Sequence, residues 1–100
     1  RRGHGYRKTA APAGHLQYQI DFAGPLLAGL KQGEVEAVAS ANTNVSGLRA
    51  IAYPNTALQA WRVTLDCERI DPRQPVELRV FLRSGSRTLS ETWSHALAPE

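Results

Sequence analysis

Glu91 lies between Leu89 and Trp93 in the stretch LSETW, and its residue type and setting suggest glycosidase chemistry. A carboxylic acid kept protonated by a neighbouring indole could donate its proton to the leaving oxygen of a glycosidic bond. That reaction needs a second carboxylate across a cleft, and residue parity points Glu77 and Asp66 toward the opposite face. A compact sandwich of this size has a filled core rather than a substrate cleft. We therefore expect Glu91 to occupy a rim position or a β-bulge.

The other residues that could do chemistry lack the partners that their reactions require. His4 and His15 lie in the N-terminal stretch, and His95 has no carboxylate or cysteine at ligand spacing, so we expect no metal site. Cys67 is the only cysteine, which excludes an internal disulfide and a cysteine-based zinc site. The serines have no GxSxG context, and Ser84-Gly85-Ser86 is typical of a hairpin turn. The sequence indicates no cofactor and no catalytic residue.

Two kinds of aromatic residue are distinguished by the face of the strand on which they fall. Trp61 and Trp93 share parity with core aliphatic residues, so we interpret them as core anchors rather than as platforms for sugar rings. Phe81 lies on the polar face of its strand, flanked by Arg79 and Arg83. An exposed aromatic residue on a charged face, in a chain that looks cut from a longer one, favours a contact between domains.

Length and composition limit the number of domains and the class of protein to which these residues belong. One hundred residues make one domain, and 42% hydrophobic residues are ordinary for a globular protein. Arg1, Arg2, Arg7 and Lys8 supply four of the twelve basic residues, so the net charge of +3 belongs to the N-terminal stretch. Because the remainder is nearly neutral, we do not expect nucleic-acid binding. The longest apolar passage, GPLLAGL, is too short to span a membrane.

Alternation of apolar and polar residues predicts the elements that position these side chains. Residues 1–15 lack periodicity and are predicted to be a linker or mobile arm, and residues 16–100 to be one domain. A break in alternation at Val38 would be reconciled by a bulge, and the inward face of residues 48–53 is left open. The predicted strands are residues 16–22, 34–41, 48–53, 61–67, 76–83 and 89–97, and the predicted core anchors are Trp61, Trp93, Phe22, Leu78 and Val80.

This pattern predicts an all-β fold with little or no helix. Short strands, each with one apolar and one polar face, are typical of two stacked antiparallel sheets. We therefore predict an immunoglobulin-like β-sandwich of six to seven strands, although the Cys…Trp…Cys signature of antibody domains is missing.

Several stretches in order resemble the C-terminal end of the periplasmic glucans biosynthesis protein G/D family (MdoG/OpgG and OpgD). They are YQIDFAGPLL, AWRVTLD and PVELRVFLRSGSRTLSETWS, within residues 16–97. The stretch NTALQA before Trp61 departs from the family, which has glycines there. The resemblance implies a parent protein of about five times this length, exported to the bacterial periplasm.

The resemblance also implies that the parent protein has two domains with different roles. A large N-terminal β-sandwich domain with a cleft would carry the catalytic acid of those members that are β-1,2-glucanases. The present chain would be a non-catalytic immunoglobulin-like domain packed on that domain, in a protein that acts in making osmoregulated periplasmic glucans with a β-1,2-linked backbone. The alternative is an independent carbohydrate-binding module that uses Trp93, Trp61 or Tyr53. A third possibility is an enzyme with Glu91 as the acid.

Overall fold

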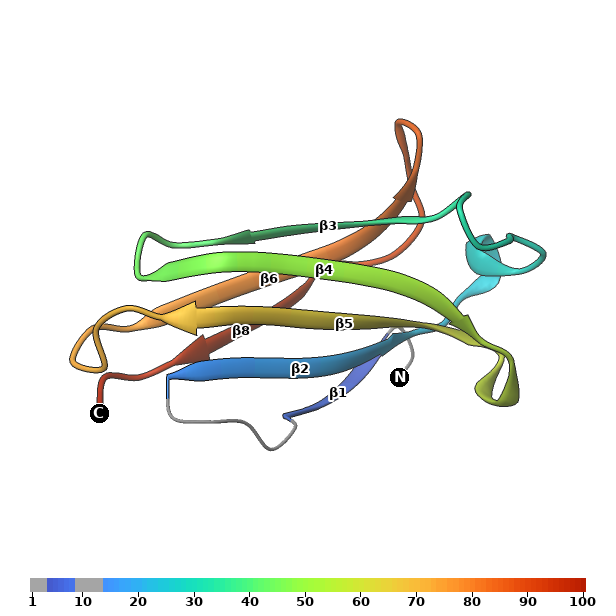
Figure 1. The fold of residues 1–100 in the computed structure, drawn as a ribbon. Coiled ribbons are helices and arrows are strands. Elements are labelled where there is room, and N and C mark those ends of the chain that lie inside the picture. The colour runs from blue at the N-terminus through green and yellow to red at the C-terminus, as the bar shows by residue number, and fades with distance from the viewer. Residues whose placement is uncertain (1–3, 9–13) are drawn as a thin grey trace.

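The computed structural model describes residues 4–8 and 14–100 and consists of two antiparallel β-sheets packed face to face (Figure 1). The first sheet has the order β1-β2-β5-β4, and the second has the order β3-β6-β8, with β7 pairing the end of β6. The strands are β1 His4–Lys8, β2 His15–Phe22, β3 Glu36–Ala41, β4 Val45–Asn55, β5 Ala60–Arg69, β6 Val76–Ser84, β7 Arg87–Thr88 and β8 Trp93–Leu97.

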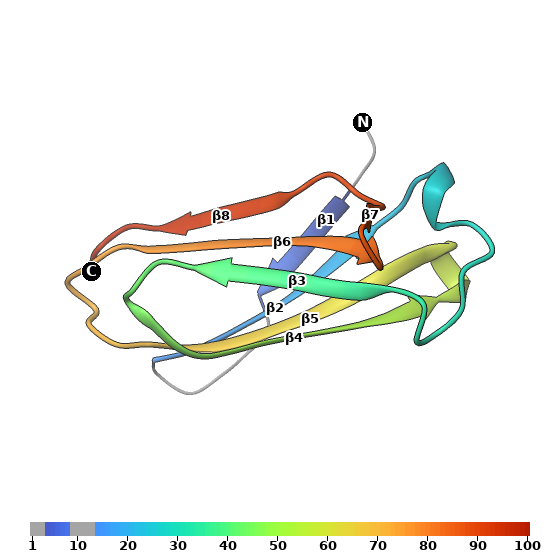
Figure 2. The ribbon, with the colours of Figure 1, turned by 90° about the horizontal axis from the view of Figure 1, so that it is seen from above.

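The order of the strands identifies the type of sandwich. Four strands in the order first-second-fifth-fourth, facing a sheet of the third, sixth and last strands, are the arrangement of constant-type immunoglobulin domains. Figure 2 shows the two layers from above, with β6 between β3 and β8. The predicted immunoglobulin-like β-sandwich is confirmed. Two short 3-10 helices, η1 Pro25–Leu27 and η2 Thr56–Leu58, lie in the connections after β2 and β4.

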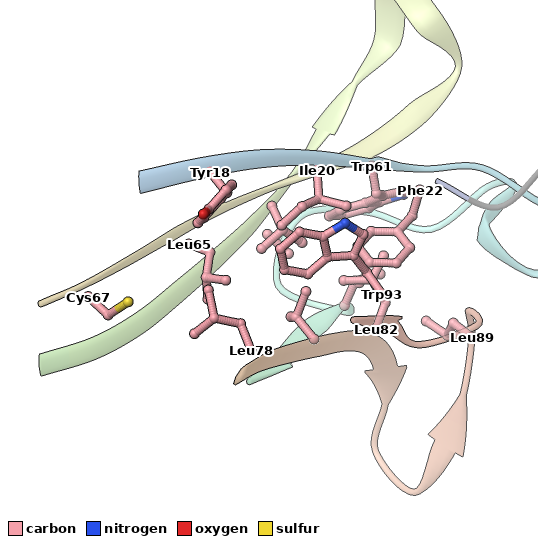
Figure 3. Packing of buried hydrophobic residues seen from close by; sticks show 14 of the residues in the cluster. Tyr18, Ile20, Phe22, Trp61, Leu65, Cys67, Leu78, Leu82, Leu89 and Trp93 are labelled. Carbon is pink, nitrogen blue, oxygen red and sulfur yellow. The ribbon is translucent and has the colours of Figure 1, made fainter. Parts of the chain in front are cut away.

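The core is built from the inward residues of both sheets (Figure 3). Residues alternate strictly between buried and partly exposed along β2, and β5 and β6 show the same period over most of their length. The five residues expected to anchor the core are all buried, with exposed fractions of 3% or less: Trp61, Trp93, Phe22, Leu78 and Val80.

Strand β4 resolves the facing that the sequence leaves open. Leu48, Ala50 and Ala52 pack on the core, while Ile51 is 59% exposed on the outer face. A register shift between Ser46 and Arg49 determines which residues of β4 face the core, and Gly47 within this shift has a φ of 63°. Because β4 is an edge strand of its sheet, it also accommodates Pro54, which has no amide hydrogen for the sheet.

Strand β3 corrects the expected bulge near Val38. Its register with β6 is continuous from the pair of Glu36 with Arg83 to the pair of Ala41 with Leu78. Val38 is directly opposite Phe81, on the outer face of the sheet. The break in alternation therefore reflects an apolar residue that faces outward, not an extra residue in the strand.

The predicted last strand is interrupted between β7 and β8. Thr88 is paired with Arg83 and Trp93 with Val80, so the chain gains two residues between these pairs. The amide of Leu89 still donates to the carbonyl of Leu82, at 2.8 Å. The reciprocal amide of Leu82 donates instead to the hydroxyl of Ser90, at 2.9 Å. The side chain of Ser90 thus replaces a backbone acceptor where the ladder is broken.

The sequence pattern does not predict strand β1. It predicts an arm or linker over residues 1–15. In the described part of that arm, residues 4–8 pair antiparallel with β2, from His4 opposite Phe22 to Lys8 opposite Tyr18. A five-residue segment with one apolar side chain carries no periodicity, so its pairing depends on contacts that are remote in sequence. Arg1 and Arg2 lie outside the described residues, and the domain boundary at residue 16 stays a prediction.

Candidate functional site

The outer face of the β3-β6-β8 sheet carries the candidate contact surface around Phe81. Phe81 is only partly exposed, and its neighbour across the strand pair is Val38. Arg79 is opposite Ser40 on one side and Ser94 on the other. An apolar pair therefore lies at the centre of an otherwise polar sheet face.

A charged pair borders this apolar pair. The Nε of Arg83 is 3.1 Å from Oε1 of Glu36, and the two residues are also partners in the strand register. Arg83 is held in place by this contact, whereas Arg79 is exposed. Phe81, Arg79 and Arg83 share the outer face because they are alternate residues of β6, and Val38 joins them from the neighbouring strand β3.

The structure does not assemble Glu91 with another of the candidate carboxylates. Glu91 is exposed in the connection between β7 and β8. Glu77 lies on the outer face of β6, opposite Ala96. Asp66 lies on the outer face of the other sheet, hydrogen-bonded to Gln17 at 2.8 Å. These three carboxylates belong to two opposite faces and a loop, an arrangement that does not place two of them across one cleft.

His15 is held between two acidic side chains instead of among metal ligands. Its Nε2 is 2.9 Å from Oδ1 of Asp66, and its Nδ1 is 2.8 Å from Oε2 of Glu68. Hydrogen bonds to Asp66 and Glu68 raise the pKa of His15 above its ordinary value of 6.5. Burial raises the pKa of Asp66, but the hydrogen bonds from His15 and Gln17 outweigh it and leave this pKa below 3.8.

Most of the remaining candidates for chemistry are buried. Burial raises the pKa of the Cys67 thiol to about 11, so the thiolate needed for reactivity is disfavoured at neutral pH. Trp61 and Trp93 are 3% and 1% exposed, which leaves no ring face for a sugar. Tyr53 is the partly exposed member of this set, and its hydroxyl lies 3.4 Å from that of Thr64 on the outer face of the first sheet.

A cluster of four aromatic rings at one edge of the sandwich was missed by the sequence reasoning. Tyr6 of β1 reaches the core side of β8, where its ring centroid lies 5.4 Å from that of Trp93 and 5.0 Å from that of His95. Tyr18 completes the cluster, with its centroid 5.6 Å from that of Trp93. His95, considered above as a metal ligand, stacks on Trp93 at 5.5 Å with an interplanar angle of 16°.

One end of the sandwich, which we call the hollow end, is formed by residues 23–35, 54–61 and 85–91 (Figure 1). A hollow of about 430 Å³ lies there, lined by eleven residues that include Leu27, Leu30, Pro54 and Trp61. None of the eleven has an ionisable side chain. A second hollow of about 390 Å³ lies among residues 23–26 and 88–91. Gly24 lines both hollows, so they are neighbours.

The opposite end, which we call the pinned end, is formed by residues 42–45, 69–75 and 98–100. The side-chain amide of Asn44 donates to the carbonyls of residues 71, 74 and 75, at 3.0 to 3.2 Å, and its oxygen accepts the amide of Asp71 at 2.9 Å. Arg69 donates from Nη2 to the carbonyls of Gln74 at 2.6 Å and Ala98 at 2.8 Å. Polar side chains thus tie separate segments together at this end.

Searches for a metal centre and a membrane span are negative for the part of the chain that the structure describes. Residues 4–8 and 14–100 contain no group of three or more histidine, cysteine or acidic side chains that is arranged to hold a metal ion. Within the same residues, no helix has the length and apolar character needed to cross a membrane.

Comparisons with known proteins agree on one family. The family model described as "Periplasmic glucan biosynthesis protein, MdoG" matches residues 1–97. "Glucans biosynthesis protein G" of Ralstonia nicotianae is 41% identical over 99% of this chain and 21% of its own length. The protein of the same name in Serratia proteamaculans is 38% identical over 86% of this chain and 17% of its own length.

A third relative extends the match to another genus. "Glucans biosynthesis protein G" of Pseudomonas aeruginosa is 36% identical over 78% of this chain and 15% of its own length. The chain thus spans about a fifth or less of the length of the curated relatives that it matches. The family model covers nearly all of the chain, and the matching stretches include those that carry the resemblance. The chain belongs to the periplasmic glucan biosynthesis protein MdoG family.

Proposed function

We propose that this chain is the non-catalytic C-terminal domain of a longer periplasmic protein that acts in the biosynthesis of glucans with a β-1,2-linked backbone. It packs on a large N-terminal domain of the same protein, which carries any catalytic acid. The family name and the short share of each relative that the chain covers support a part of a larger protein. The periplasmic location is inferred from the family in the same way.

The observation that carries this proposal is the apolar pair of Phe81 and Val38 on the outer face of β3 and β6. Outer faces of antiparallel sheets are ordinarily polar, because they meet water. A partner that covers Phe81 would gain the burial of both side chains, and Arg79 would remain at the rim to meet an acidic group. A contact of this kind between domains of one chain needs only a modest apolar centre.

The scattered carboxylates support a role that is not catalytic. Glu91, Glu77 and Asp66 lie in a loop and on two opposite faces, so these three carboxylates do not share a cleft. We expect the 100-residue chain, incubated alone with β-1,2-glucan, to release no reducing ends. Release of reducing ends that is abolished by Glu91→Gln would overturn the non-catalytic assignment.

Nuclear magnetic resonance tests the contact directly. The isotopically labelled chain is mixed with the separately produced N-terminal domain of the same protein, and amide signals are followed. The proposal predicts shifts at Val38, Phe81 and Ser94, which share the outer face, and no shifts at Gln19 and Thr64 on the opposite face. Unchanged signals around Phe81 at saturating concentration of the added domain would rule out this contact.

The same labelled chain tests the alternative of an independent carbohydrate-binding module. Among its candidates Trp93, Trp61 and Tyr53, both tryptophans are buried, so Tyr53 is the one left for stacking on a sugar. Titration with β-1,2-linked glucooligosaccharides up to millimolar concentration is expected to leave the signals around Tyr53 unchanged. Saturable shifts centred on Tyr53 would favour the binding module over the docking domain.

A further inference from the structure

The hollow end presents an apolar surface that the proposed function leaves without a role. Leu26 is 45% exposed and lines the second hollow beside Pro25, which is also exposed. The first hollow, next to it, is lined mainly by Leu27, Leu30, Pro54 and Trp61 together with small residues. Concave apolar surface at the end of a small domain is typical of a place where another part of a protein packs.

The hydrogen bonds of the hollow end mostly stay within one loop or join a loop to a strand. The backbone bonds of η1 and η2 join residues three apart, such as Leu27 to Gly24 at 3.2 Å and Gln59 to Thr56 at 3.2 Å. A side-chain bond from Gln32 to the carbonyl of Ala52 ties the first loop to β4, at 3.0 Å. These bonds close single turns and anchor the loop base, and the two hollows remain between the loops.

The course of β1 indicates which part of a longer protein can reach this surface. His4 is opposite Phe22 in the register, and Phe22 is two residues before Gly24, which lines both hollows. The chain therefore begins β1 at the hollow end and runs from there toward the pinned end (Figure 2). Each residue before His4 adds at most about 3.6 Å of reach. The chain thus enters β1 at the end of the sandwich that carries the hollows.

We propose that the hollow end is the seat of the domain that precedes β1 in the longer protein, and that apolar side chains of that domain fill the two hollows. This inference rests on the proposed function. It adds a second contact region to the surface around Phe81 on the outer face of the β3-β6-β8 sheet. The two regions are continuous, since Phe81 is three residues from the end of β6 at Ser84, where the hollow end begins. A combined surface suits a domain contact better than the isolated apolar pair.

A neutral sugar is the competing occupant of the first hollow, because Asn55, Thr56 and Gln59 contribute hydrogen-bonding groups to its lining. The observations favour a protein side chain. Trp61, the aromatic residue of the hollow, is 3% exposed and offers no face for stacking. The aliphatic lining from Leu27, Leu30 and Pro54 suits an apolar side chain better than a hydroxylated ring.

The test uses the full-length protein that carries this domain, with Leu26→Asp as the variant and Ile70→Asp as its matched control. Both side chains are exposed in this chain, at 45% and 60%, but Ile70 lies at the pinned end. We expect Leu26→Asp to increase the rate of proteolysis between the two domains by about tenfold, because cleavage follows the population of the separated state. Ile70→Asp should leave that rate unchanged.

A third variant, Phe81→Asp, separates this inference from the proposed function. If Phe81→Asp speeds cleavage and Leu26→Asp behaves like Ile70→Asp, the domain contact stands and the hollow end is not part of it. If none of the three variants speeds cleavage, both proposals fail. Protection of residues 54–61 by added glucooligosaccharide, with no effect of Leu26→Asp on cleavage, would assign the first hollow to a sugar and overturn the inference.

Discussion

The two ends of this sandwich differ in how their loops are held. At the pinned end, Asn44 and Arg69 connect three separate segments through side-chain hydrogen bonds, and Arg69 is 7% exposed. At the hollow end, most loop bonds close single turns, and two hollows lie between the loops. Hydrogen bonds between its own segments stabilise the pinned end in this chain, although Nε of Arg69 is buried without a partner among the described residues, whereas apolar hollows gain free energy when they are filled.

The outer faces of the two sheets differ in how their apolar residues are paired, since the exposed Ile51 of the first sheet is opposite Thr64. The β1-β2-β5-β4 sheet presents paired polar groups, such as Arg62 with Asp21 at 2.8 Å and 3.0 Å, and His15 with Asp66. The β3-β6-β8 sheet places Phe81 and Val38 side by side. The hollow end and the Phe81 face together thus form the side of the molecule that we expect to be covered in the longer protein.

The largest effect on the free energy of unfolding is expected at the pinned end, for Arg69→Met. The substitution keeps much of the aliphatic stem but removes the donors to the carbonyls of Gln74 and Ala98. The Arg69 side chain is 7% exposed, and loss of its bonds to these carbonyls, of which that of Gln74 keeps Asn44 as a donor, is expected to lower the free energy of unfolding by about 2–4 kcal/mol. Urea unfolding of the 100-residue chain measures it.

Arg73→Met is the matched control, because Arg73 is 84% exposed and pairs locally with Asp71 at 3.2 Å. Its effect is expected to stay within about 0.5 kcal/mol. Equal losses for the two arginine variants would remove the distinction between a pinned end and an ordinary polar surface.

A smaller loss is expected for Asn44→Ala at the same end. The amide group of Asn44 bonds to the loop that connects β5 with β6, and alanine leaves those backbone groups without that partner. We expect a loss of about 1–3 kcal/mol in thermal or urea unfolding. Thr43→Ala, at the exposed neighbouring position, should change stability by less than about 0.5 kcal/mol. Equal free energies of unfolding for the two alanine variants would contradict the role of Asn44 in holding the pinned end together.

The His15 contacts make part of the stability of the first sheet depend on pH. Since the hydrogen bonds to Asp66 and Glu68 raise the pKa of His15 in the folded state above 6.5, the stabilisation is complete below 6.5 and is lost as pH rises through that higher value. At the acid limit it fades as Asp66 is protonated, below 3.8. The difference in unfolding midpoint between the native chain and His15→Gln should therefore be largest at pH about 5 and should shrink as pH rises through the raised pKa of His15.

If the difference in unfolding midpoint between the native chain and His15→Gln stays constant from acid to alkaline pH, the charge on His15 does not contribute to stability. The effect is expected to be small because His15 is 30% exposed and Glu68 is 54% exposed, so that water screens both contacts.

The smallest effect is expected at the hollow end, for Leu26→Ser in the 100-residue chain. Leu26 is 45% exposed, and its loss should change the free energy of unfolding by less than about 0.5 kcal/mol. Its neighbour Leu27 is 5% exposed within the core cluster, and Leu27→Ala should cost about 2–4 kcal/mol. A large loss for Leu26→Ser would mean that Leu26 stabilises this domain itself, which would weaken its assignment to a partner surface.

Sequence reasoning predicted the parts of the fold that depend on local alternation. Strands β2, β5 and β6 have strict inward and outward periods, so their faces and the burial of Trp61 and Trp93 follow from parity. The outward position of Val38 was also visible, but it was interpreted as a bulge because its partner Phe81 is remote in sequence.

The features that escaped prediction depend on contacts between distant segments. Tyr6 alone gives no pattern, and β1 is explained only when Tyr6 meets Trp93 and His95 on the other sheet. Asn44 belongs to the run Asn42-Thr43-Asn44, whose composition is typical of a turn, and no residue near Arg69 marks it as a link between loops. The hollows follow from how three loops meet in space, which no local signal records. The candidate contact at Phe81 remains a prediction.

Carbene footprinting of Leu26 and Ile70, in the 100-residue chain and in the full-length protein, tests the central claim most directly. Both side chains are exposed in this chain, at opposite ends of the sandwich. The account predicts that Leu26 is labelled in the short chain and protected in the full-length protein, while Ile70 is labelled equally in both. Equal labelling of Leu26 in the two proteins, with Ile70 unchanged, would contradict a hollow end covered by the preceding domain.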